Sequence, residues 1–394
     1  MKRILSMSLV IMLLISIVPV IPVEAATQTI TYLTKAVYES VGDYSEGLVW
    51  VKEGDTFKYL NEKGEVVIDL SNKKYVGKKE YIDSVGDFHD GLALIKVVKE
   101  DSEDDYEYSA NLGGYYIDKK GNIALTTAQV NKKQSGKNKI SGLYYSFSQG
   151  ITITDTRPED GKVALVKTDG STKWVAAEAA YFWYTQDLMC VGSYVDGDYL
   201  WGYVDKNYKK VISYKFEDAR PFNNNLAPVE IDGKWGFIDK TGKTVIKAQF
   251  DDFVVHDSNA SYIVFDDGLA TVKKNGKWGV IDKKGKTVIA FKYEEYSPVI
   301  FRNGYACVAG SNGKYTYIDK TGKTVIKTGY EDANYFTESG VAVVGNKGVY
   351  KLIDTKGNQV GKKTWKFDGT NVSGMAPDIL KYKIKGKWGI AKVG

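Results

Sequence analysis

Apolar and polar residues alternate along most of this chain in short stretches separated by turn residues, a pattern typical of β-strands. The stretch from Leu269 to Ala290 shows the arrangement clearly. A first strand, Leu269 to Lys273, precedes Asn275-Gly276, which favours a two-residue hairpin because both residues tolerate positive φ. A second strand is followed by the turn Asp282-Lys283-Lys284-Gly285 and by a third strand over Thr287 to Ala290. The segment therefore predicts a three-stranded β-meander.

The same meander recurs as an internal repeat. The sequences GKWGFIDKTGKTVI, GKWGVIDKKGKTVI and GKYTYIDKTGKTVI begin at Gly233, Gly276 and Gly313, and a truncated last copy begins at Gly386. Counting the weaker copies gives about nine units. Because one meander is marginally stable alone, we expect the units to stack on one another. The turn glycines that mark the units are Gly64, Gly121, Gly170, Gly242, Gly285, Gly322 and Gly357, with Tyr208 in that place once.

Two further features occupy fixed places in the units. An aromatic residue lies three positions ahead of a glycine that opens the first strand, as in Tyr44 before Gly47 and Phe88 before Gly91. Ahead of it lies an aromatic residue followed by an acidic one. These pairs are Tyr38-Glu39, Phe216-Glu217, Phe250-Asp251, Tyr293-Glu294, Tyr330-Glu331 and Phe367-Asp368.

The repeat resembles the bacterial WG-containing repeat family, named for a Trp-Gly pair. The pair occurs here at Trp201-Gly202, Trp235-Gly236, Trp278-Gly279 and Trp388-Gly389. The resemblance covers nearly all of the chain after the leader, is strong between residues 200 and 326, and is degenerate at about 110–191. It implies a β-rich array and, in many members, an extracellular or envelope setting, but no one shared activity.

The two ends of the repeat array predict how it closes. Residues 29–34 match the third strand of a unit, whereas the last unit stops after its second strand, so the early strand can complete the final unit. Such closure removes exposed sheet edges. The fold predicted is all-β, a propeller-like ring, with a curved β-solenoid as the alternative because units of 34 or 35 residues are short for four-stranded blades.

The first 25 residues have the features of a signal peptide. Lys2 and Arg3 precede an apolar stretch from Ile4 to Val20, and a cleavage site is expected after Ala25. The predicted organisation is a signal peptide at 1–25 and a β-repeat array at 26–394. The protein is therefore expected to be secreted or associated with the cell envelope, without membrane insertion after cleavage.

Composition leaves little material for catalysis. The chain has 394 residues but only two His and two Cys, and no metal-binding or nucleophile motif is recognisable. The repeated Asp239 and Asp282, with Gly242 and Gly285, are explained by their turn positions. An acidic loop at residues 101–107 is interpreted as a solvated insertion, and Cys190 and Cys307 as small buried residues. No cofactor, metal or enzymatic activity is expected.

Aromatic residues supply the candidate sites. The repeated Trp201, Trp235, Trp278 and Trp388 are interpreted as anchors of the core between units. Aromatic residues outside the repeat frame are the stronger candidates for a recognition surface. The candidate ligand-binding residues are Trp183, Tyr184, Tyr194 and Tyr199, and Tyr144-Tyr145 also breaks the pattern.

These observations predict a non-catalytic extracellular binding or scaffold module that recognises cell-wall polysaccharide or an envelope protein. Two alternatives are a glycan- or peptide-hydrolysing enzyme on a propeller frame and an inhibitor of a single protein. The net charge of +5 comes from interspersed residues of both signs, so a nucleic-acid partner is not expected. A mild preference for anionic cell-wall polymers is compatible with this charge.

Overall fold

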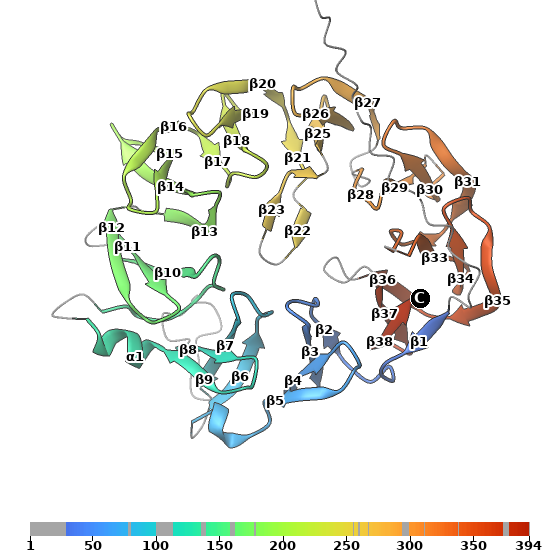
Figure 1. Ribbon diagram of the computed structural model, residues 1–394, viewed down its shortest axis with the longest axis horizontal. Coiled ribbons are helices and arrows are strands. Elements are labelled where there is room, and N and C mark those ends of the chain that lie inside the picture. The colour runs from blue at the N-terminus through green and yellow to red at the C-terminus, as the bar shows by residue number, and fades with distance from the viewer. Residues whose placement is uncertain are drawn as a thin grey trace, which may run out of the picture.

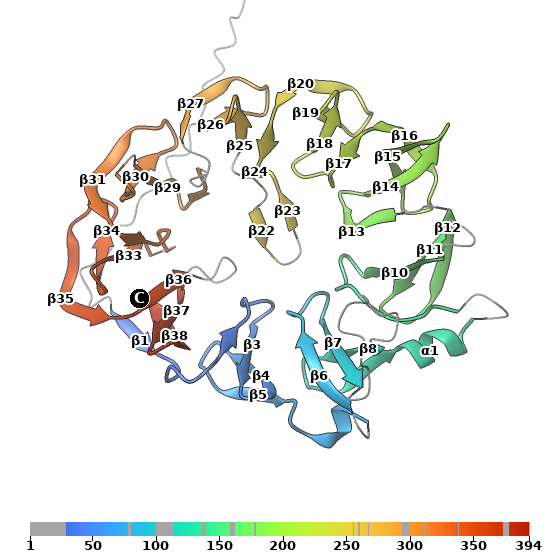
Figure 2. The same ribbon diagram turned by 180° about the vertical axis from the view of Figure 1, so that it is seen from behind.

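The computed structural model describes residues 29–77, 80–99, 113–134, 139–157, 162–176, 179–254, 256–258, 261–266, 268–293, 299–310, 312–337, 339–372 and 378–393. The predicted signal peptide and the acidic loop at residues 101–107 lie outside these ranges. The described residues form nine small antiparallel sheets arranged around a central axis, as in a β-propeller (Figures 1 and 2). The predicted all-β fold and its propeller-like ring are thus confirmed.

We number the sheets as blades in chain order and give their strands from the axis outward. Blade 1 consists of β2 (Ser40–Val41), β3 (Leu48–Glu53), β4 (Thr56–Asn61) and β5 (Val66–Asp69). Blade 2 consists of β6 (Glu80–Val85), β7 (Leu92–Lys99), β8 (Gly113–Asp118) and β9 (Ile123–Thr126). Blade 3 consists of β10 (Ile151–Arg157), β11 (Lys162–Lys167) and β12 (Thr172–Ala176). Blade 4 consists of β13 (Ala179–Thr185), β14 (Leu188–Val195), β15 (Asp198–Asp205) and β16 (Lys210–Phe216). Blade 5 consists of β17 (Asp218–Ala219), β18 (Leu226–Ile231), β19 (Lys234–Asp239) and β20 (Thr244–Phe250). Blade 6 consists of β21 (Asp252–Phe253), β25 (Leu269–Lys274), β26 (Lys277–Asp282) and β27 (Thr287–Tyr293), and β24 (Phe265–Asp266) also pairs with β25.

Blade 7 consists of β28 (Phe301–Arg302), β29 (Tyr305–Ala309), β30 (Tyr315–Asp319) and β31 (Thr324–Tyr330). Blade 8 consists of β32 (Asp332–Ala333), β33 (Val341–Asn346), β34 (Val349–Asp354) and β35 (Gln359–Lys366). Blade 9 consists of β36 (Gly369–Val372), β37 (Ile379–Ile384), β38 (Lys387–Val393) and β1 (Ile30–Tyr32). A separate hairpin, β22 (His256–Ser258) with β23 (Ser261–Ile263), points toward the centre of the ring (Figure 1). Two helical turns, η1 (Lys73–Tyr75) and α1 (Thr127–Lys132), connect blades 1 to 2 and 2 to 3. Among the described residues, no helix has the length and hydropathy that a membrane span requires.

Most blades contain one strand more than the predicted meander. The three predicted strands are present, and a short strand nearest the axis precedes them; in blades 1, 5, 6, 7 and 8 this inner strand has only two residues. The segment between the aromatic-acidic pair and the first predicted strand supplies it. Because the blades converge toward the axis, two residues suffice there, and a unit of 34 or 35 residues can hold four strands.

The order of the strands gives the ring two different faces. In blade 5, β17 pairs with β18, β18 with β19, and β19 with β20, all antiparallel. The connections from first to second strand and from third to fourth strand therefore lie on one face, which we call the turn face. The two-residue hairpin Asp232-Gly233, between the second and third strands, lies on the opposite face, which we call the hairpin face.

The hydrophobic core is divided among the junctions between blades. The described residues contain nine buried apolar clusters, and each joins two adjacent blades. Between blades 5 and 6, for example, Trp235 and Phe237 pack with Phe253 and Phe265, and the Trp235 and Phe253 ring centroids are 4.7 Å apart. Buried tyrosines add hydrogen bonds across the junctions: the Tyr203 hydroxyl donates to the Arg220 carbonyl at 2.8 Å. The blades thus depend on their neighbours for stability.

Residues far apart in sequence close the ring. Strand β1 pairs with β38, with Ile30 opposite Val393 and Tyr32 opposite Ala391. The predicted completion of the final unit by the early strand is confirmed. Side chains strengthen the seam, because the buried Lys381 of blade 9 pairs with Asp43 of blade 1.

Asp87 of blade 2 lies beside this seam. Burial, with repulsion from the Asp43 carboxylate, raises the pKa of Asp87 to about 6, although the Asp43 N–H and the Trp50 indole donate hydrogen bonds to it. The folded protein therefore binds a proton between about pH 4 and pH 6 that the unfolded chain does not.

We expect the free energy of unfolding to fall as pH rises through this window, by about 1–3 kcal/mol from Asp87 alone. Urea unfolding of the wild type and of Asp87→Asn at several pH values between 4 and 7 measures the effect. The variant should show a flatter profile, whereas Asp55→Asn, at an exposed carboxylate, should not. Equal slopes in wild type and Asp87→Asn would contradict the assignment.

The turn glycines pack against the preceding blade. Gly285 has φ of +80°, and a Cβ there would lie 2.9 Å from Cγ2 of Ile246 in blade 5. Gly276 in the hairpin of the same blade has φ of +75° but no atom within 4 Å of a Cβ.

Substitution of these two glycines separates backbone strain from packing. Gly276→Ala is expected to destabilise by about 1 kcal/mol, because only the left-handed backbone is strained. Gly285→Ala carries the same strain and also displaces Ile246, so we expect a total loss of about 2–4 kcal/mol. Thermal and urea unfolding measure both values, and equal losses would show that the contact with Ile246 is unimportant.

Truncation of a junction tryptophan should destabilise the ring more. Trp235→Ala removes a buried ring from the junction between blades 5 and 6, and we expect a loss of about 3–5 kcal/mol. Val245→Ala, at an exposed site of the same blade, is the control and should change stability by less than about 0.5 kcal/mol. An unchanged melting temperature for Trp235→Ala would refute a structural role.

Candidate binding surface

The repeated aspartates are held within their own turns. Asp239 Oδ1 accepts hydrogen bonds from the N–H groups of Thr241 and Lys243 at 2.9 and 3.1 Å. Asp282 makes the same contacts with Lys284 and Lys286, both at 2.9 Å. A further hydrogen bond from the Thr241 hydroxyl leads the interactions that lower the pKa of Asp239. These carboxylates stabilise the turns that Gly242 and Gly285 complete.

The acidic residues of the aromatic-acidic pairs have a structural place that the sequence did not reveal. Where the structure describes them, these carboxylates accept hydrogen bonds from the backbone of the hairpin in the blade that follows them: Glu217 from Gly233 N at 2.8 Å, and Asp251 from Gly276 N at 2.9 Å. Lys234 of blade 5 pairs with the other oxygen of Asp251 at 2.8 Å. Lys387 and Glu39 form the equivalent ion pair across the closing seam. The hydrogen bonds therefore fix these hairpins to their blades, and the ion pairs link neighbouring blades on the hairpin face.

In blades 4, 5 and 6 the glycine of the Trp-Gly pair lies under a bulge of the outermost strand. In blade 5, Trp235 is opposite Phe250 and Phe237 is opposite Ile246, so β20 has two extra residues between these positions. A Cβ on Gly236 would lie 2.6 Å from the Ala248 nitrogen. Trp235 and Trp278 are buried, and Trp201 and Trp388 are half-buried against the clusters of their junctions. The backbone bulge explains why glycine follows tryptophan.

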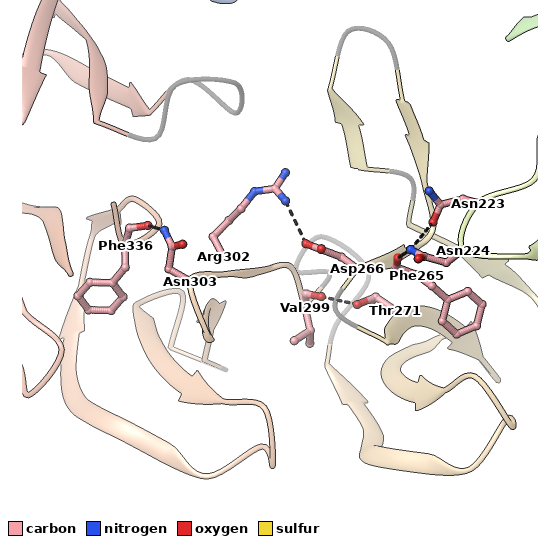
Figure 3. A network of polar contacts seen from close by, with 9 residues as sticks. All are labelled: Asn223, Asn224, Phe265, Asp266, Thr271, Val299, Arg302, Asn303 and Phe336. Atoms are coloured by element: carbon pink, nitrogen blue, oxygen red, sulfur yellow. Dashed lines mark hydrogen bonds and ion pairs between the residues drawn. The ribbon is translucent and has the colours of Figure 1, made fainter. Parts of the chain in front are cut away.

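A belt of polar side chains links the inner turns on the turn face. In several of the turns between the first and second strands, a polar residue with φ near +50° reaches the next blade: Glu46 accepts from Gly91 N at 3.1 Å, and Asp90 accepts from Gly150 N at 2.8 Å. The sequence pattern did not predict this belt, although its polar residue recurs two positions after the aromatic. Figure 3 shows the part of the belt between blades 5 and 8. Asn224 and Asn303 donate to the carbonyls of Phe265 and Phe336, and Arg302 pairs with Asp266 at 3.2 Å.

The candidate aromatics that depart from the repeat do not form one surface. The side chains of Trp183 and Tyr184 lie outside the described part of the structure, but the backbone pairs Tyr184 with Met189 at the turn-face end of blade 4. Tyr194 and Tyr199 face each other at the opposite end, next to the β14–β15 hairpin. Tyr194 is five positions after Met189, about 17 Å along a strand. The two candidate pairs are thus at opposite ends of the blade.

Tyr194 and Tyr199 occupy a hairpin that projects from the hairpin face. Strands β14 and β15 have eight residues each, whereas the equivalent strands of blade 5 have six. The added cross-strand pairs include Tyr194 with Tyr199, whose ring centroids are 5.2 Å apart. Tyr199 in turn contacts Trp201 at 5.8 Å, and Tyr194 remains 58% exposed. This aromatic hairpin continues the core of the junction between blades 4 and 5 into solvent.

The remaining candidates are dispersed over the ring. His89 is buried in blade 2, and the side chain of His256 lies outside the described residues. Cys190 is buried in blade 4, Cys307 is half-buried in blade 7, and the two are unpaired. In the described ranges, no group of three or more His, Cys, Asp or Glu side chains is placed to hold a metal ion. Tyr145 is exposed, but it precedes β10 of blade 3, whereas the aromatic hairpin belongs to blade 4.

Comparisons with solved structures agree with the ring architecture. A crystal structure of a eukaryotic initiation factor matches with a TM-score of 0.55 and 12% identity, covering 88% of this chain and 90% of the other. Dipeptidyl peptidase 4 of Porphyromonas gingivalis matches with a TM-score of 0.51 and 10% identity, covering 88% of this chain and 65% of the other. At these identities the similarity shows the fold alone. The comparison with curated proteins gave no match.

The sequence itself matches a repeat family at five places. The model described as "WG containing repeat" matches residues 31–57, 201–235, 235–278, 278–315 and 315–350. Three of these stretches begin at the tryptophans of Trp-Gly pairs, and the last four follow one another around blades 4 to 8. The first stretch begins within β1, the strand that closes the ring. The chain belongs to the family of proteins built from the WG containing repeat.

Proposed function

We propose that this protein is a non-catalytic binding or scaffold module that acts outside the cytoplasmic membrane and recognises cell-wall glycan through the aromatic hairpin of blade 4. The expected setting rests on the signal peptide predicted at residues 1–25 and on the envelope setting that the family resemblance implies. The repeated tryptophans, aspartates and acidic residues already have contacts within the ring. A ligand is therefore expected to bind where the chain departs from the repeat.

The observation that carries the proposal is the exposed Tyr194 ring on a hairpin longer than that of blade 5. An exposed tyrosine ring presents an apolar face with a polar hydroxyl, a combination that suits the apolar faces and hydroxyl groups of sugars. The contacts of Tyr199 with Tyr194 and Trp201 hold the rings in place. Tyr199 also covers Gly192, where a Cβ would lie 2.4 Å from the tyrosine hydroxyl. The surface is thus preorganised, which reduces the entropy lost on binding.

Co-sedimentation with isolated cell walls tests the proposal. The purified chain starting at Ala26 is mixed with intact walls and with walls stripped of protein. We expect it to sediment with both, and Tyr194→Ala to weaken binding to stripped walls by about five- to tenfold, as for a central aromatic contact. Its melting temperature should stay unchanged because Tyr194 is exposed.

Tyr81→Ala is the matched control, since Tyr81 is 50% exposed on β6 of blade 2. It should bind walls like the wild type. Loss of sedimentation after stripping would replace glycan by an envelope protein as the partner. Absence of sedimentation with either preparation would overturn the proposed function.

A further inference from the structure

The outermost strands of blades 4 to 8 form a continuous basic wall. Strands β16, β20, β27, β31 and β35 follow one another along the outside of the ring (Figure 1) and contain no Asp or Glu. In the other four blades, the outermost strands β1, β5, β9 and β12 carry one lysine, Lys173, and one acid, Asp69. The eight lysines of the wall, here called the lysine arc, are Lys210, Lys215, Lys247, Lys292, Lys327, Lys362, Lys363 and Lys366.

The charges of the lysine arc are available to a ligand. All eight side chains are exposed, and within the described residues none of them forms an ion pair. Several ammonium groups lie over aromatic rings of the same strand, such as Lys215 at 5.1 Å from the Phe216 ring and Lys292 at 5.3 Å from the Tyr293 ring. These contacts keep the stems against the wall and limit their freedom.

The turns next to the lysine arc extend its positively charged surface. Between residues 205 and 358, the five turns on the turn face of blades 4 to 8 carry ten lysines and five aspartates. Each of these aspartates caps its own turn through hydrogen bonds from backbone N–H groups. The described acids of the aromatic-acidic pairs are instead at the hairpin face, where Glu217 and Asp251 cap hairpins. The fold thus separates lysines from acids in space although they are interspersed in sequence.

The shape and chemistry of the lysine arc favour a flexible polyanion as the ligand. Lysine ammonium groups are hydrated point charges that respond to charge density, whereas the bidentate recognition of single phosphate or carboxylate groups favours arginine. No arginine occurs in the five strands. The outer wall of a ring is convex, so a stiff DNA duplex, with a persistence length of about 150 base pairs, would touch it at few phosphates. A flexible single chain can instead follow the curve and contact lysines of successive blades.

We propose that the lysine arc binds a flexible anionic polymer of the cell wall, whose phosphodiester or carboxylate groups recur along one chain. This inference rests on the envelope-binding function proposed above and names a second ligand class and a second surface for it. The aromatic hairpin is on the hairpin face of blade 4, where the lysine arc begins. One protein molecule can therefore contact a neutral glycan and an anionic polymer of the same cell wall.

Binding of soluble polymers tests the inference. The full chain from Ala26 is titrated with poly(glycerol phosphate), polygalacturonate, neutral dextran and single-stranded oligo(dT), at several salt concentrations. We expect binding to one or both of the first two polymers and none to dextran, with affinity falling steeply as salt increases. A preference for poly(glycerol phosphate) or for polygalacturonate identifies phosphodiester or carboxylate chemistry.

Two triple variants with equal net charge locate the surface. Lys247→Glu, Lys292→Glu and Lys327→Glu together reverse the centre of the arc, and Lys63→Glu, Lys120→Glu and Lys132→Glu together reverse exposed lysines of the first two units. The arc variant should lose at least about tenfold in affinity. The slope of log affinity against log salt concentration should be shallower by about two, because each lost contact with a single-stranded polyanion changes it by about 0.7. The control variant should stay within about threefold of the wild type. Circular dichroism and thermal unfolding verify that both variants are folded.

Equal losses in the two variants would overturn the inference, because net charge and not the arc would then govern binding. Tighter binding of oligo(dT) than of either wall polymer would overturn it in favour of nucleic acid. A wild type that sediments with stripped walls but binds neither anionic polymer would overturn the lysine arc alone and leave the proposed glycan binding intact. Failure of both assays would overturn both proposals.

Discussion

Burial of apolar side chains between neighbouring blades is the interaction on which the rest of this structure depends. A meander of three or four short strands cannot enclose a core, so each of the nine clusters takes residues from two blades. The repeated residues serve this requirement in different ways. Trp235 fills a junction, Gly285 lets the next blade approach Ile246, and Tyr203 supplies a hydrogen bond to the neighbouring backbone. Each repeat unit therefore supplies half of the interface with the blade before it and half of the interface with the blade after it.

Much of the fold follows from local patterns in the sequence. Asn275-Gly276 and the turn ending at Gly285 mark the strand ends, and these local signals depend on only a few neighbouring residues. Ring closure could also be predicted, because residues 29–34 match the strand that the last unit lacks. The short inner strands could not, since two residues such as Asp218–Ala219 carry no periodicity. The role of Glu217 and Asp251 as hairpin caps was likewise hidden, because each carboxylate contacts a turn more than fifteen residues away.

The candidate site shows the same limit. Composition and departure from the repeat pointed to Tyr194 and Tyr199, and the strand register places them on one projecting hairpin. Trp183 and Tyr184 also depart from the repeat, but the register of β13 places them at the other end of the blade. Charge was harder to interpret from the sequence. Lys247 and Asp251 are four residues apart in the chain, yet one is on the outer wall and the other caps a hairpin. Only the geometry of the blade separates them.

The pairing of β1 with β38 has a consequence for the order in which the molecule is assembled. A ribosome makes Ile30 more than 350 residues before its partner Val393, so the first strand waits through nearly the whole of synthesis without its neighbour. Blades 1 to 8 can stack in sequence as they emerge, but blade 9 is completed only by an encounter between the oldest and the youngest parts of the chain. The closing seam therefore cannot form before the last strand is available. Until then, the nascent ring exposes an unpaired strand edge at each end, which is a period of vulnerability to aggregation.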